Sequence, residues 1–375
     1  MKYVLLTSAK FFMFKLAESL HSSGNLERIV TGYPKIMLKE ENLPFEKIES
    51  HSIFQIADYG IRKLNLKSRL IKDFTSDANR LYLDKITSSR IGDSDLISMS
   101  SLSLYTARKV KSRGNKFIVN RSSFHILNQR EILLEVAKKW NWPEEIPSKL
   151  SILRELEEYE MADKIVVPSL AAYKSFISSN VREDKLVLNP FPIEIRNKDV
   201  LERERSGILF VGNVTLQKGF PTLVQAFNRL GNSGLILNVV GAYSPKFINH
   251  LSKQGLNFQN IVFHGHMNRS DLARMYLSND IFVLPSVHDG WGMVVNEAIS
   301  FGCIPIVSNG AGAGQLIQNG VNGFTFISGD TNDLLEKIQN SLGNEQMRYE
   351  MNRSLTGSVG SVKTWDDFAR VYLDL

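Results

Sequence analysis

The sequence contains a single cysteine, Cys303, among 375 residues. One cysteine excludes an internal disulfide, and its place in an apolar run is typical of a small buried thiol in a reducing compartment. No run of about 18 apolar residues could form a membrane-spanning helix. The apolar start is short and is soon followed by Lys10 and Lys15, which favours a first buried strand over a signal peptide. We therefore expect a cytoplasmic protein that does not cross a membrane.

The sequence also has few cofactor signatures. No Gly-x-Gly-x-x-Gly follows the first predicted strand, which argues against a Rossmann oxidoreductase. No His, Cys and Asp cluster has metal-ligand spacing. The Asp-x-Asp pattern at Asp93 and Asp95 precedes a predicted strand instead of following one, so we expect a solvated turn. The sequence thus predicts no metal and no cofactor.

Net positive charge is confined to the first half. Residues 1–195 carry 30 Lys and Arg against 24 Asp and Glu, whereas residues 196–375 carry 15 of each. Basic clusters lie at 62–72 and 108–116, and nucleic acid, an anionic membrane surface or plain solvation could each explain them. No nucleic-acid motif accompanies them, so we expect no nucleic-acid partner. Leucines interleave with the first cluster, which makes peripheral contact with the inner face of a membrane the functional alternative that we favour.

Short Val- and Ile-rich runs alternate with segments of helical period in both halves, a pattern typical of parallel sheets covered by helices. A Pro-containing segment near residue 190 and the charged stretch 196–205 interrupt it. We predict an α/β fold with two Rossmann-like domains, 1–195 and 196–360, whose parallel sheets face a central cleft, followed by a capped helix in 361–375. The expected strands are Tyr3–Thr7, Ile29–Thr31, Leu96–Met99, Lys116–Val119, Lys164–Val167, Ser206–Gly212, Leu235–Val240, Ile261–His264, Ile281–Leu284, Ile304–Val307 and Gly323–Phe326.

The strand that ends near Val211 leads into a candidate anion site. Gly212 permits a tight turn, and Lys218 is placed to reach an anion. The helix that starts near Phe220 offers unsatisfied N–H groups and a positive dipole end. A diphosphate would suit this loop, although a glycine after a strand and a lysine before a helix are common.

A second candidate site follows the strand Ile281–Leu284. Gly290 and Gly292 permit close approach of the backbone at the start of a helix. Asp289 lies on the loop, and Glu297 is expected about two turns into the helix. Since carboxylates accept hydrogen bonds from vicinal hydroxyls, one acid can serve a ribose and the other a sugar ring.

In order and spacing, these motifs resemble the nucleotide-sugar half of glycosyltransferase family 4, retaining enzymes of the GT-B architecture. The resemblance rests on Gly212 to Gly219, Asp289 to Ala298 and Gly302 to Val307. It implies that Lys218 binds the donor diphosphate, Asp289 contacts the donor sugar and Glu297 holds the ribose hydroxyls. Further donor contacts implied by it are Gly212, Asn213, Gly290, Trp291, Gly292, Met293 and Val294.

The sequence departs from the family pattern at two positions. Asn213 replaces the usual arginine and removes a guanidinium that would bind phosphate bidentately. Asp289 replaces a glutamate and is one methylene shorter. Either change could tune donor choice, and both together could weaken activity.

The first half resembles the family more loosely, at residues 120–129 after the strand Lys116–Val119. In a GT-B enzyme this edge of the cleft faces the donor sugar. By that likeness His125 is a candidate catalytic contact, and Arg121 and Ser123 are candidate contacts to an acceptor or an anion. A structural role for His125 is an equal alternative.

We therefore expect a retaining, metal-independent transferase that moves a sugar from a nucleoside diphosphate sugar to a hydroxyl of a glycan or lipid-linked saccharide. Synthesis of glycans, surface polysaccharides or glycolipids is the expected setting. A GT-B nucleotide-sugar epimerase and a catalytically weak carbohydrate-binding homologue remain alternatives. The nucleotide base, the sugar, the acceptor and the oligomeric state do not follow from the sequence.

Overall fold

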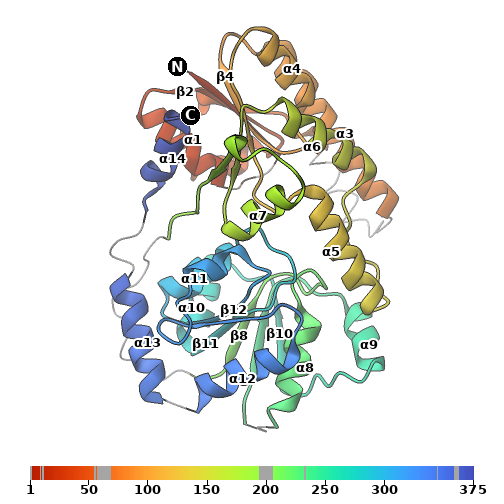
Figure 1. The fold of residues 1–375 in the computed structure, drawn as a ribbon, viewed down its shortest axis with the longest axis vertical. Coiled ribbons are helices and arrows are strands. Elements are labelled where there is room, and N and C mark those ends of the chain that lie inside the picture. Colours follow the sequence, from red (N-terminus) through yellow and green to blue (C-terminus); the bar gives the residue numbers. More distant parts are fainter. Residues whose placement is uncertain are drawn as a thin grey trace.

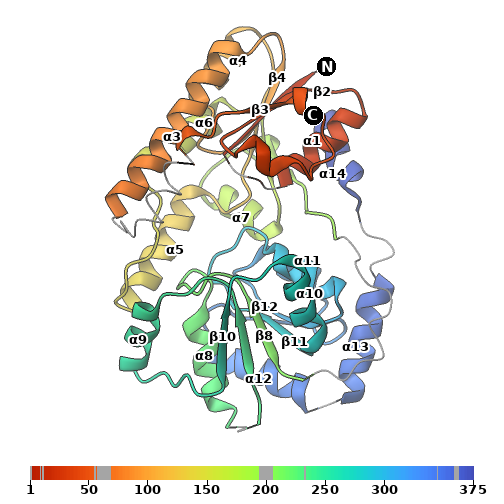
Figure 2. The same cartoon turned by 180° about the vertical axis from the view of Figure 1, so that it is seen from behind.

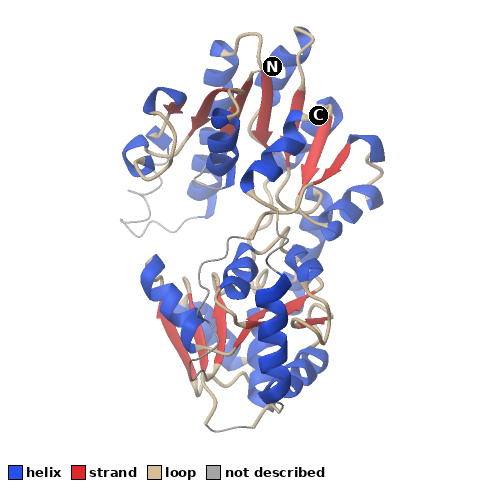
Figure 3. Ribbon diagram, turned by 90° about the vertical axis from the view of Figure 1, so that its left-hand side faces the viewer, coloured by secondary structure: helices blue, strands red, loops and turns tan. Residues whose placement is uncertain are grey.

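The computed structural model describes residues 2–8, 10, 12–54, 56, 69–193, 206–231, 234–343, 345–358 and 363–375. Within them the chain forms two α/β bodies, one above the other in Figure 1. Figure 3 shows one sheet in each body with helices packed around it. The predicted α/β fold with two Rossmann-like domains is confirmed.

The first sheet has seven parallel strands in the order β3-β2-β1-β4-β5-β6-β7. All five residues of β1 are buried, as expected for a parallel sheet with helices on both faces. Its strands are β1 (Tyr3–Thr7), β2 (Leu26–Thr31), β3 (Ile48–Ser50), β4 (Asp95–Met99), β5 (Phe117–Asn120), β6 (Lys164–Val167) and β7 (Leu186–Leu188). The α-helices of this body are α1 (Phe12–Ser22), α3 (Arg69–Arg90), α4 (Leu104–Ser112), α5 (Ile126–Lys139), α6 (Lys149–Met161) and α7 (Leu170–Ser178).

The second sheet has six parallel strands in the order β10-β9-β8-β11-β12-β13. Strands β8 and β11 are neighbours at its centre, so the loops that follow them emerge side by side. Its strands are β8 (Ile208–Val211), β9 (Leu237–Val240), β10 (Ile261–Gly265), β11 (Ile281–Leu284), β12 (Ile304–Ser308) and β13 (Phe324–Phe326). The helices that follow them are α8 (Phe220–Arg229), α9 (Pro245–Lys253), α10 (Arg269–Ser278), α11 (Met293–Ser300), α12 (Thr331–Leu342) and α13 (Glu345–Ser358).

The last helix, α14 (Trp365–Leu373), lies against the first body (Figure 1). The predicted capping box is present, with Thr364 accepting from the N–H of Asp367 and the Asp367 side chain accepting from the N–H of Thr364. The hydroxyl of Tyr372 donates to Oδ1 of Asn120 at 2.9 Å, and the hydroxyl of Tyr3 donates to the carbonyl of Tyr372 at 2.9 Å. These buried bonds tie the end of the chain to β1 and β5.

Two details of the sequence interpretation need correction. Strands β3 and β7 are not predicted, because three residues are too few to show a pattern. The expected solvated turn at Asp93 to Asp95 is only half right. Asp93 is exposed, but Asp95 begins β4, is 6% exposed and accepts a hydrogen bond from the N–H of Lys116 at 2.7 Å. Its carboxylate thus joins two strand starts.

Candidate active site

The loop between β8 and α8 packs tightly against the end of β11. Gly219 has φ +64° and caps α8. A Cβ on Gly219 would lie 1.7 Å from the carbonyl oxygen of Pro285, so only glycine fits there. The N–H of Val287 donates to the carbonyl of Gln217 at 2.9 Å. The two loops therefore form one unit at the carboxyl ends of the central strands.

This unit brings Lys218 and Asp289 together. The Nζ of Lys218 lies 2.5 Å from Oδ2 of Asp289, and the two side chains are 24% and 16% exposed. The residues implied for the donor diphosphate and the donor sugar are thus direct neighbours. A bound diphosphate would compete with Asp289 for the lysine, or share it.

The N–H groups of this loop are less available than the sequence indicates. Leu216 and Gln217 donate to the carboxylate of Glu144, Lys218 donates to Oγ1 of Thr215, and Gly219 donates to the carbonyl of Leu216. Because these four N–H groups already have partners, the main candidate in the loop for meeting a phosphate is the ammonium of Lys218, which Asp289 also contacts. Asn213, earlier in the same loop, is exposed.

The glycines after β11 serve contacts of different kinds. Gly292 has φ +95° and caps α11, and a Cβ there would lie 2.7 Å from a methyl carbon of Leu284. Gly290 meets the first domain, because its Cβ would lie 2.1 Å from the carbonyl oxygen of Ser122. Trp291, between them, is 2% exposed, and its Nε1 donates to Oδ1 of Asn296 at 2.9 Å. The Trp291 ring is therefore part of the core and is not placed to touch a donor.

Glu297 lies away from the Lys218 pair, in a pocket between the two domains. It is the fifth residue of α11, little more than one turn into the helix instead of the expected two, because α11 begins only at Met293. Its Oε2 accepts from the hydroxyl of Tyr276 at 3.1 Å, and the same hydroxyl lies 3.4 Å from the carbonyl oxygen of Val294. The pocket has a volume of about 480 Å³ and is lined by Lys10, Phe12, Lys15, Glu40, Glu41, Pro192, Arg269, Met293, Asn296, Glu297, Ser300 and Trp365.

His288 is a central residue that the sequence interpretation passed over. Its side chain is buried against Phe124 of the first domain, with ring centroids 4.6 Å apart, and its Nε2 lies 3.2 Å from Oγ of Ser123. Burial, assisted by the charges of Arg121 and Lys218, lowers the pKa of His288 to about 4, so the ring is neutral at pH 7. Its position directly before Asp289 was the only feature of the sequence that could have marked His288 as a site residue.

His125 is not brought to this site. Its ring packs against those of Tyr159 and Phe176, at centroid distances of 5.2 Å and 5.0 Å, and the residue is 2% exposed. Burial lowers its pKa to about 4. The ring is part of the first domain's core, which favours the structural alternative, because an apolar surrounding excludes substrate.

Arg121 is held by its own domain. Its guanidinium donates to the carbonyl of Phe124 at 3.0 Å and to Oε1 of Gln129 at 2.5 Å, and it pairs with Glu155 at 3.3 Å. These contacts shape the turn that carries Ser123. Of the three first-domain candidates, only Ser123 reaches the second domain.

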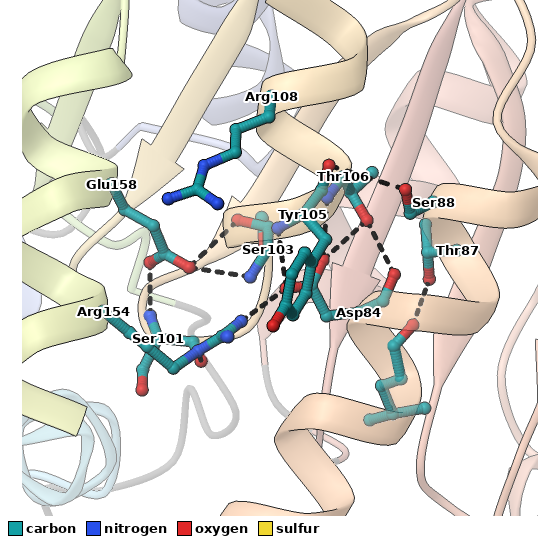
Figure 4. Close-up of polar contacts among 12 residues, drawn as sticks. Asp84, Thr87, Ser88, Ser101, Ser103, Tyr105, Thr106, Arg108, Arg154 and Glu158 are labelled. Atoms are coloured by element: carbon teal, nitrogen blue, oxygen red, sulfur yellow. Dashed lines mark hydrogen bonds and ion pairs between the residues drawn. The ribbon is translucent and has the colours of Figure 1, made fainter. Parts of the chain in front are cut away.

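A buried charged network supports the loop after β4 (Figure 4). The carboxylate of Glu158 accepts from the N–H groups of Ser101 and Ser103 at 2.5 Å and 2.7 Å. Asp84 accepts from the N–H of Thr106 at 2.8 Å and pairs with Arg154. The two acids thus cap the start of α4, where negative charge is favourable. Burial nevertheless raises the pKa of Glu158 to about 8.

The second basic cluster is engaged within the protein. Arg108 pairs with Glu157, Lys111 pairs with Asp163, and Arg113 donates to the carbonyl of Ile91. Solvated and paired helix faces explain this cluster without an external partner. The side chains of the first cluster, 62–72, lie outside the described residues. Across the described segments, no helix is long and apolar enough to span a membrane, and no group of three or more His, Cys, Asp and Glu could hold a metal ion.

Two Rossmann-like domains with a pocket between them define the GT-B architecture. The whole chain aligns with the crystal structure of Anabaena HepE in complex with UDP, at a TM-score of 0.69 and 13% identity, over 100% of this chain and 99% of HepE. At this identity the likeness concerns the fold.

Residues 193–355 match the family described as glycosyl transferases group 1. A glycosyltransferase of Methanocaldococcus jannaschii is 25% identical over 57% of this chain and 60% of its own length. The match thus spans less than two thirds of that relative. The capsular polysaccharide biosynthesis glycosyltransferase CapM of Staphylococcus aureus is 22% identical over 68% of this chain and 71% of its own length.

Proposed function

We propose that this protein is a retaining, metal-independent glycosyltransferase that moves a sugar from a nucleoside diphosphate sugar to a hydroxyl acceptor. The observation that carries the proposal is the contact between Lys218 and Asp289 at the ends of β8 and β11, inside a domain that matches the glycosyl transferases group 1 family. A cation beside a carboxylate suits the junction of a diphosphate with a sugar.

In the proposed complex the nucleoside lies in the pocket that Glu297 lines. The Oε2 of Glu297 is oriented by Tyr276, so a ribose hydroxyl can donate to the carboxylate. Lys10, Lys15 and Arg269 also line this pocket, where Glu40, Glu41 and Glu297 balance their charge and Lys10 pairs with Glu41 at 2.6 Å. Residues of both domains form its wall, so donor binding and the domain arrangement are coupled.

Transfer breaks the bond between the anomeric carbon and the diphosphate. Negative charge then develops on the leaving oxygen, and the ammonium of Lys218 is the group placed to stabilise it. Lys218 thereby supplies the positive charge for which other transferases use a metal ion. Asp289 contacts the sugar hydroxyls, and it shares the ammonium of Lys218 with the diphosphate. Retention of configuration is part of the proposal by likeness to family 4.

The acceptor is proposed to be a glycan or a lipid-linked saccharide. The likeness to CapM, whose name places it in capsular polysaccharide biosynthesis, supports this class of acceptor. Peripheral contact with the inner face of a membrane would bring a lipid-linked acceptor to the first domain. Ser123 of the first domain contacts the loop after β11 through His288, with its Oγ 3.2 Å from Nε2 of the ring.

A thermal-shift screen with uridine, guanosine and adenosine diphosphates and their sugars tests the proposal. We expect at least one nucleotide to raise the melting temperature, and its sugar to be transferred to an added glycan acceptor. An altered sugar on the nucleotide without transfer would identify an epimerase. Binding of a glycan without any nucleotide release would identify a carbohydrate-binding protein.

A further inference from the structure

Residues 140–144, between α5 and α6, form a strap from the first domain onto the second. In Figures 1 and 2 the end of α5 lies beside α9. Trp140 is buried in the core of the second domain, and its carbonyl oxygen lies 2.8 Å from Nε2 of His250. The ring of Trp142 packs on Phe247 and His250 at centroid distances of 5.1 Å and 4.9 Å. The strap is thus anchored on α9 of the second domain.

The strap ends at a buried carboxylate that contacts the donor loop. Glu144 is 7% exposed, and its Oε2 accepts from the N–H of Leu216 at 2.8 Å and from the N–H of Gln217 at 3.2 Å. Its Oε1 accepts from the N–H of Glu145 at 3.0 Å. Among the described residues no lysine or arginine pairs with Glu144. Backbone N–H groups thus hold the side chain of Glu144 in place.

The contact with Glu144 holds Gln217, the residue next to Lys218, from one side. The loop after β11 holds Gln217 from the other side. Gln217 receives the Val287 N–H at its carbonyl, and its side-chain amide donates to the carbonyl of His288 at 3.2 Å. Gln217 is therefore fixed at its N–H, its carbonyl and its side chain. Lys218, the next residue, takes its backbone direction from this arrangement.

We propose that Glu144 is a positioning residue for the donor site, supplied by the first domain. It orders the 215–218 turn so that the ammonium of Lys218 meets the donor diphosphate, and it makes this order depend on docking of the strap. The inference rests on the proposed function. Without the carboxylate, two buried N–H groups would lose their acceptor, and the turn would rearrange to find another.

The test compares Glu144→Ala, Glu144→Gln and Trp142→Ala with the wild-type chain and with the control Glu135→Gln. Glu135 is exposed on α5, so its replacement removes the same charge without touching the loop. The probe is whichever of uridine, guanosine and adenosine diphosphate binds the wild-type chain most tightly. Calorimetry gives its Kd, donor kinetics give KM and kcat, and hydrogen exchange reports on the amides of Leu216 and Gln217.

We expect Glu144→Ala to raise Kd and the donor KM about tenfold, the size of effect that one lost buried interaction produces, with a smaller change in kcat. Exchange at the two amides should accelerate. Glu144→Gln keeps one acceptor oxygen and should recover part of the affinity, which also covers the case of a poorly folded alanine variant. Trp142→Ala should have a similar effect, and the Glu135→Gln control should behave as wild type.

Two results would overturn the inference while the proposed function stands. The first is wild-type Kd and exchange in both Glu144 variants. The second is a loss of kcat in both Glu144 variants without any change in Kd. If the wild-type chain binds no nucleoside diphosphate at all, the proposed function fails first, and the inference fails with it.

Discussion

Replacing Gly290 by alanine should separate the two domains at the donor site. A Cβ at this position would lie 2.1 Å from the carbonyl oxygen of Ser122 and 2.5 Å from Cα of Ser123. Non-bonded carbons need about 3.5 Å, so the Ser122 backbone must retreat by roughly 1 Å or more. Backbone atoms cannot rotate aside as a side chain can. Strain of about 1–3 kcal/mol, typical of overpacking, should therefore reduce stability or open the domain contact.

The matched control is Gly92→Ala, because nothing lies within 4 Å of a Cβ there. We expect Gly290→Ala to lower the thermal midpoint and to increase the radius of gyration in small-angle scattering relative to this control. Transfer activity should fall at least tenfold, because Ser123 and His288 lose their contact. If Gly290→Ala matched the control in midpoint, radius and turnover, the domain arrangement described above would be wrong.

Two further predictions concern charge. Because the folded chain keeps a proton on Glu158 up to about pH 8 that the unfolded chain releases near 4.5, stability should fall as pH rises through this window, by at most about 1.4 kcal/mol per pH unit. The buried histidines titrate alike in the wild type and in Glu158→Gln, so the difference between the two unfolding free energies in urea isolates Glu158. This difference should change between pH 6.5 and 8 as the wild type loses its advantage, and a difference independent of pH would refute the assignment. Asn213→Arg should tighten nucleoside diphosphate binding about tenfold by adding a charge-assisted contact, which calorimetry can measure; weaker binding would count against a phosphate beside residue 213.

Much of the fold follows from the sequence because it depends on local patterns. Buried parallel strands need continuous Val and Ile runs, and β1 and β11 have the predicted bounds for that reason. The capping box at Thr364 and Asp367 likewise depends on residues three positions apart. The three-residue strands β3 and β7 carry too little pattern to be predicted.

The candidate site was predictable only where residues follow a strand directly. Lys218 and Asp289 come together because β8 and β11 are neighbours, which the parallel-sheet rule favours. Glu144 and His288 escaped notice because their contacts join the two domains across 72 and 165 positions of sequence. His125 misled for the opposite reason, since a polar neighbourhood in sequence need not be polar in space, and its ring packs among aromatic side chains.

The central claim is that Lys218 and Glu297 bind the two ends of a nucleoside diphosphate. Calorimetric titration of the wild-type chain, Lys218→Ala and Glu297→Ala with the nucleotide selected by the thermal-shift screen tests it most directly. We predict measurable binding to the wild type, binding at least tenfold weaker to Lys218→Ala, and none to Glu297→Ala. Equal affinity of all three proteins for the nucleotide would contradict the claim.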